Sequence, residues 1–199
     1  MKPIIKRSLL LSALMTGGLL VATTTTVLAE EQSVRVEGTI EPMLMDLSVP
    51  STFSFNINPN DANGNYFTSS DYTLSNYSSV PLKVSITQFE SSKESGVHQF
   101  NDVLPSEHQN WLGLSESLTM KDFALGLKVT NPSEWISVTR NDTIWAKEVQ
   151  DSSNPIEIGV MPDETGSVHF SLEAKHGLKF SKSIHPVYDI SLLFEFVEE

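Results

Sequence analysis

A loop rich in asparagine and aspartate is the first place in the sequence whose side chains could bind a metal. Residues 56–67 read NINPNDANGNYF and contain Asp61, Asn63 and Gly64, the residue types of a calcium-binding loop. When Gly64 takes the position of the conserved EF-hand glycine, Pro59 falls where the first ligand is required, and the final glutamate is missing. The sequence therefore favours a plain turn at Asn63-Gly64. Asp61 and Asn63 remain the candidate ligands of a looser calcium contact.

A second group of candidates lies in residues 91–121, the longest stretch without regular alternation. It contains Trp111 and His108. A flat indole ring can pack against the apolar face of a sugar, so this pair is a candidate binding site for a glycan. Burial in the core is the alternative for Trp111, and it is the favoured expectation for Trp135 and Trp145.

Motifs for nucleophilic or zinc chemistry are missing from the sequence. The chain has no cysteine and no Gly-x-Ser-x-Gly sequence, which a nucleophilic hydrolase would commonly use. The five histidines lack the spacing of zinc ligands, and we expect them to be ordinary surface residues. We therefore predict a non-enzymatic protein that needs no cofactor, with a secreted hydrolase as the remaining alternative.

The first 29 residues have the features of a secretory signal peptide. A basic start precedes an apolar run at 9–22, and small residues lead to a predicted cleavage site after Ala29. Two glycines and four threonines interrupt the apolar region, which is shorter than the roughly 20 residues of a membrane span. We therefore predict a secreted, extracellular protein, with cell-surface association as an option, and one domain at residues 30–199.

The charge of the chain restricts its partners. The formal net charge is −12, and the predicted signal peptide holds three of the 13 cationic side chains, so the rest of the chain is more acidic still. An acidic surface repels nucleic acid and anionic membranes. We expect no nucleic-acid partner and no membrane insertion. Self-association, other cell-surface proteins and glycans remain as partners.

Alternation of apolar and polar residues dominates the rest of the sequence. A period of two places one set of side chains on a buried sheet face and the other set in solvent. The pattern is clearest at 123–129, 168–174 and 188–196, and turn dipeptides separate these and weaker runs. We therefore predict an all-β fold, an antiparallel β-sandwich of about ten short strands that is jelly-roll-like. The best helical candidate is a short turn at 105–114.

A further strand is predicted at the start of the mature chain. In SVRVEGTI, Val34, Val36 and Ile40 lie on one face of an extended segment. A terminal strand can pair at the edge of its own sheet, or it can be donated to a neighbouring subunit. These three residues are therefore the candidate assembly strand.

Several phrases of the sequence resemble one group of secreted proteins. They are TIEPMLMDLSVPSTFSFNINPN, YTLSNYSSVPLKVSI, MPDETGSVHFSLEAKHG and YDISLLFEFV. In style they resemble secreted β-sandwich proteins of the surface and matrix of Gram-positive Firmicutes, loosely the TasA/camelysin group of biofilm-fibre proteins. The resemblance implies a secreted structural or matrix protein and carries over no functional residue. A secreted adhesin-like module that binds a glycan or a protein is the alternative function.

Overall fold

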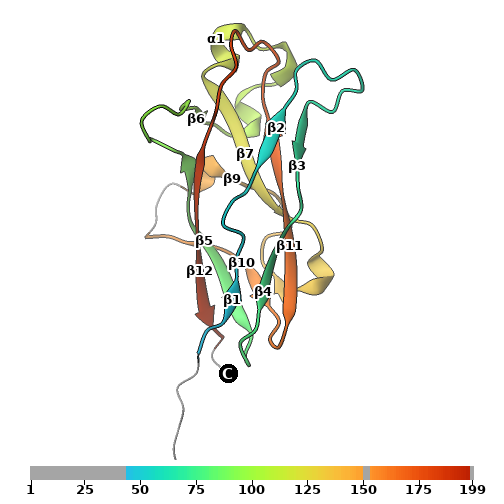
Figure 1. The fold of residues 1–199 in the computed structure, drawn as a ribbon, viewed down its shortest axis with the longest axis vertical. Coiled ribbons are helices and arrows are strands. Elements are labelled where there is room, and N and C mark those ends of the chain that lie inside the picture. Colours follow the sequence, from blue (N-terminus) through green and yellow to red (C-terminus); the bar gives the residue numbers. More distant parts are fainter. Residues whose placement is uncertain (1–43, 150–152, 198–199) are drawn as a thin grey trace, which may run out of the picture. The chain divides into compact units, whose positions relative to one another are not determined.

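The structure is a computed structural model that describes residues 44–149 and 153–197. Within these ranges the chain forms twelve strands and several single-turn helices (Figure 1). The strands are β1 (Leu47–Ser48), β2 (Phe55–Ile57), β3 (Phe67–Ser69), β4 (Tyr72–Asn76), β5 (Leu82–Ser91), β6 (Asn101–Asp102), β7 (Asp122–Val129), β8 (Ser137–Val138), β9 (Ile144–Trp145), β10 (Ile156–Met161), β11 (Gly166–Lys175) and β12 (Tyr188–Phe196). The helices are α1 (Glu116–Thr119) and the 3-10 turns η1 (Pro105–Glu107), η2 (Trp111–Gly113), η3 (Pro132–Glu134) and η4 (Ala146–Glu148).

The strands form two main sheets and a small hairpin. The first sheet has the order β1-β4-β11-β7-β6, with β9 also paired to β7. The second has the order β12-β5-β10-β8, and β2 pairs with β3. All pairs are antiparallel except the short pairing of β6 with β7. The prediction of an all-β fold is confirmed, and the jelly-roll topology stays a prediction.

One hydrophobic core joins the two main sheets. Its members come from β4, β7 and β11 on one side and from β5 and β10 on the other. In β5, Leu82, Val84, Ile86 and Phe89 are completely buried. Apolar and polar side chains alternate along β5 as far as Thr87, where a β-bulge shifts the register with β12. The predicted inward faces of 123–129, 168–174 and 188–196 all contribute to this core or pack against it.

The outer face of β7 is also covered, which the alternating pattern did not predict. A second cluster, called here the satellite cluster, consists of Val103, Trp111, Leu114 and Ala124. It is built by the segment between β6 and β7, which contains η1, η2 and α1. The predicted helical turn at 105–114 is therefore present as two 3-10 turns. Part of the segment 91–121 therefore covers the outer face of β7.

The connection between β4 and β5, residues 77–81, is fixed by a buried side chain. Asn76 is fully buried at the end of β4. Its Nδ2 donates to the carbonyls of Val80, at 2.9 Å, and Pro162, at 3.0 Å, while its Oδ1 accepts from the backbone N–H of Ser78. One amide thus satisfies three backbone groups that a tight turn would otherwise leave without partners.

Both ends of the described chain meet at this connection. The carbonyl of Asp46 accepts a hydrogen bond from the N–H of Tyr77, and the N–H of Asp46 donates to Ser78 Oγ. At the other end, the N–H of Val197 donates to the carbonyl of Pro81. The start of β1 and the end of β12 therefore lie at the same end of the two sheets. None of the helices in the described ranges has the length and apolar character that a membrane crossing needs.

Candidate functional site

The asparagine-rich loop is a turn that uses its own carboxylate. It connects β2 to β3, and Gly64 has a φ of +80°. Oδ1 of Asp61 accepts hydrogen bonds from the N–H groups of Asn63, at 2.8 Å, and Asn65, at 3.1 Å. Asn63 itself has no positive φ, so the glycine alone supplies the left-handed conformation. Within the described residues, no three His, Cys, Asp or Glu side chains are grouped so as to hold a metal ion.

The predicted glycan pair is brought together, but its aromatic ring faces inward. Trp111 is only 8% exposed and belongs to the satellite cluster, and its Nε1–H donates to the carbonyl of Pro105. His108 lies edge-on to this indole, with ring centroids 4.8 Å apart, and its Nε2 is 3.0 Å from Oδ2 of Asp122. The Trp111 ring is therefore not available as a surface platform for a sugar. Trp135 is buried as expected.

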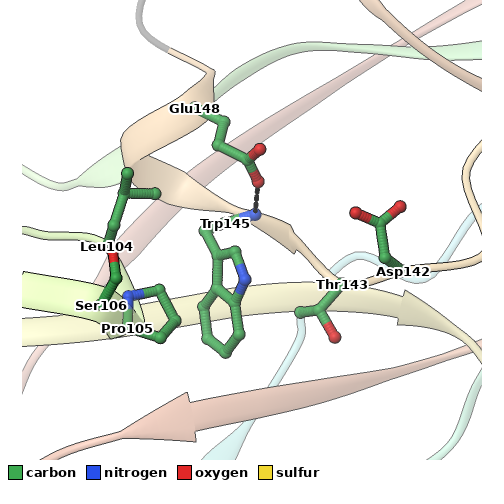
Figure 2. Close-up of a pocket in the computed structure, with 7 residues that line it drawn as sticks. All are labelled: Leu104, Pro105, Ser106, Asp142, Thr143, Trp145 and Glu148. Atoms are coloured by element: carbon green, nitrogen blue, oxygen red, sulfur yellow. Dashed lines mark hydrogen bonds between the residues drawn. The ribbon is translucent and has the colours of Figure 1, made fainter. Parts of the chain in front are cut away.

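The third tryptophan lines a surface pocket. The pocket has a volume of about 370 Å³ and is bordered by Leu104, Pro105, Ser106, Asp142, Thr143, Trp145 and Glu148. Figure 2 shows the ring of Trp145 between Pro105 and Thr143, with its nitrogen edge toward Thr143 and Asp142. We call this site the Trp145 pocket. Sequence reasoning placed Trp145 in the core, so the structure reveals a partly exposed ring where burial was favoured.

An arginine organises the two carboxylates of the Trp145 pocket. Arg140 donates to both oxygens of Asp142, at 2.8 and 3.0 Å, and its Nη2 lies 3.4 Å from Oε1 of Glu148. The other oxygen of Glu148 accepts from the backbone N–H of Trp145 at 2.7 Å. The hydrogen bond from Arg140 lowers the pKa of the Asp142 carboxyl, which therefore stays ionised near neutral pH. Donors and acceptors are held in place beside the indole.

The histidines include one buried residue, which corrects the expectation that they all lie on the surface. His176 is 5% exposed and contacts the rings of Phe67, Phe123 and Phe180. Its Nδ1 lies 2.8 Å from the carbonyl of Gly177, so Nδ1 carries the ring proton. Burial lowers the pKa of His176, and the hydrogen bond to the carbonyl offsets only part of that effect.

Acidification is expected to destabilise the fold through His176. Its folded pKa lies below its ordinary value, so the unfolded chain takes up a proton first as pH falls through about 6.5. The His176 contribution to stability is therefore present above that pH and is lost below it. In a His176→Asn variant, the amide keeps a donor for the Gly177 carbonyl without titrating. Lowering the pH from about 7.5 to about 5.5 should therefore lower the melting temperature of the wild type more than that of the variant. Equal falls in the two proteins would contradict this assignment.

The long edge strand β12 presents an unsatisfied sheet edge. It pairs with β5 over nine residues, and among the described residues no strand pairs with its other side. We call this side the open edge of β12. Its core-facing side chains are only partly buried, whereas those of β5, which has a neighbour on each side, are completely buried. The partly buried set is Tyr188, Ile190, Leu192, Phe194 and Phe196.

Exposed apolar side chains lie on either side of β1, just after β4 and at the end of β12. They are Leu44, Met45, Val49, Tyr77 and Val197, with exposed fractions from 40% to 74%. The candidate assembly residues Val34, Val36 and Ile40 lie outside the described residues. Residues 41–43 separate them from this apolar end.

The geometry defines an all-β protein of two packed sheets with a shallow surface pocket and a long open sheet edge. No protein-family model matches the chain, and the search of curated proteins finds no match either.

Proposed function

We propose that this protein is a secreted, non-enzymatic structural component of a cell surface or extracellular matrix that assembles with copies of itself. In this proposal the segment that contains Val34, Val36 and Ile40 adds as a strand to the open edge of β12 of the next subunit. The observation that supports it best is the partial burial of the core-facing side chains of β12. A strand added there would cover them and pair with their free backbone groups.

The sequence of the donor segment is suited to this edge. Val34, Val36 and Ile40 share the period-two face of a strand that packs on a core, and the intervening residues are polar or small. The donor would leave its own subunit beside Leu44, which is 74% exposed. The exposed apolar residues at that end would be covered when subunits meet, as expected of an interface.

Charges placed on the core-facing side of the donor segment are expected to abolish assembly. We expect the secreted protein to form large assemblies as its concentration rises, measured by light scattering and electron microscopy. The double variant Val34→Asp/Val36→Asp should stay monomeric, because each carboxylate would have to be buried at the acceptor edge. Its circular dichroism and melting temperature should match those of the wild-type monomer, since the acceptor fold is untouched.

A matched control places the same two charges on the other face of the segment. Ser33→Asp/Thr39→Asp changes the net charge equally and should still assemble. Two results would overturn the proposal. One is assembly by the Val34→Asp/Val36→Asp protein that equals the wild type. The other is a wild type that stays monomeric at every concentration and loses stability with the same double substitution, because the strand would then belong to its own subunit.

A further inference from the structure

We propose that the Trp145 pocket is a carbohydrate-binding site that takes a single neutral pyranose ring, with the indole of Trp145 as the stacking platform and Asp142, which Arg140 holds in place, at its rim. The site is separate from the open edge of β12, and the proposal does not depend on assembly. It moves the expected glycan contact from Trp111 to a tryptophan that the sequence had assigned to the core.

The indole is supported from behind. Trp145 pairs with Gly126 of β7, and a Cβ at that glycine would lie only 2.9 Å from Cε3 of the ring. The ring therefore rests closely on the sheet, and the satellite cluster packs against it. A rigid, partly exposed aromatic ring loses little conformational entropy when a ligand packs on it.

The polar groups around the platform match hydroxyl groups. Each sugar hydroxyl both donates and accepts, so it suits a rim that offers both functions. Each oxygen of Asp142 accepts one hydrogen bond from Arg140 and keeps capacity for another, and 70% of this side chain is exposed. Arg140, which is not one of the lining residues, fixes the orientation of this carboxylate. Thr143 is held by a 2.6 Å hydrogen bond to Glu173, so its side chain keeps a fixed orientation.

The charges at the pocket favour a neutral sugar over an organic cation, the other ligand that an aromatic ring with carboxylates can bind. Both carboxylates of the pocket already contact Arg140. A quaternary ammonium group would therefore gain little from carboxylates that are already paired. A neutral ring forms hydrogen bonds with these carboxylates and does not need an unpaired negative charge. The volume, about 370 Å³, lies at the small end of the range for ligand sites, about 300–1,000 Å³, which suits one ring rather than a long chain.

The test uses ligand-observed NMR and indole chemical shifts with a panel of methyl pyranosides and with choline. The panel holds glucose, galactose, mannose and N-acetylglucosamine derivatives at millimolar concentrations. We expect saturation transfer to at least one pyranoside, together with a shift of the Trp145 Nε1–H resonance. Trp145→Ala should weaken binding roughly tenfold or more, because the stacking surface is lost.

Two further variants still test the proposal if Trp145→Ala disturbs the fold. Trp145→Phe preserves an aromatic side chain against the satellite cluster and should bind more weakly than the wild type. Asp142→Asn changes only an exposed rim group and should also weaken binding. Tyr66→Ala removes a partly exposed aromatic side chain from the β2–β3 loop, outside the pocket, and should leave binding unchanged. No transfer to any pyranoside, transfer that Trp145→Ala leaves unchanged, or binding of choline alone would each overturn the assignment.

Discussion

Replacing Asn76 by leucine is expected to lower the free energy of unfolding by about 3 kcal/mol or more, because three backbone groups of buried or partly buried residues lose their hydrogen-bond partner at once. Leucine has the same number and branching of side-chain heavy atoms but bulkier methyl groups, so the substitution leaves no cavity, and the loss comes from the missing hydrogen bonds and from tighter packing. The carbonyls of Val80 and Pro162 and the N–H of Ser78 would be left without the amide that now satisfies them. Urea denaturation monitored by tryptophan fluorescence measures the change, provided that the slope with denaturant stays constant.

Two comparisons assign the Asn76 effect to its hydrogen bonds. Asn76→Asp keeps the size and the acceptor for Ser78, but it turns an oxygen toward two carbonyls and should be strongly destabilising as well. Asn131→Leu changes an exposed asparagine whose amide contacts only Glu134, and it should alter stability by less than about 0.5 kcal/mol. A loss at Asn76 no larger than that at Asn131 would show that the connection between β4 and β5 does not depend on this side chain.

Truncation of Phe123 to alanine is expected to cost about 3–5 kcal/mol, since a fully buried ring leaves a cavity in the centre of the core. Phe123 stacks on Phe100, with ring centroids 4.9 Å apart, and on Phe55, at 5.9 Å. It also contacts Tyr188 at the start of β12, at 6.1 Å. The ring therefore joins β7 to the hairpin and to the strand that carries the open edge.

A second variant distinguishes the loss of the Phe123 ring volume from the general sensitivity of the core to substitution. Phe123→Leu keeps most of the buried volume and should cost clearly less than the alanine variant in the same urea titration. In the alanine variant, near-ultraviolet circular dichroism should also lose intensity, because the stacked rings lose their fixed geometry. A cost below about 1 kcal/mol for Phe123→Ala would mean that neighbouring rings close the cavity.

The long strands of the fold could be predicted from the sequence because the alternation of apolar and polar residues along each strand reflects which of its side chains are buried. In β11, Val168, Phe170 and Leu172 face the core, as the period of two requires. The short strands β3 and β6 were not predicted, since two or three residues cannot show a period. The covered outer face of β7 was also missed, because Ala124 and Gly126 look like small solvent-side residues until the segment that packs over them is known.

Two side chains show why sites are harder to predict than strands. His176 follows directly after β11, and its burial depends on rings from β3, β7 and a later loop, which no local pattern connects. Trp145 lies in strand β9, and its partial exposure depends on Gly126 and on the segment 104–106. Arg140, Asp142 and Glu148 are close enough in sequence to suggest an ion-pair network, and this spacing is the signal that could have pointed to the pocket.

Under the proposed assembly, the open edge of β12 also limits the number of subunits that one molecule can contact. The other edge strands in the described ranges are short: β1, β6, β8 and β9 have two residues each and β2 and β3 have three, whereas β12 offers nine. Short edges are poor templates for strand addition. A molecule with one donor segment and one acceptor edge is bifunctional in the sense of polymer chemistry. Under the proposed assembly, such a molecule would grow by addition at either end into linear, polar chains, without the third functional group that a branched network requires.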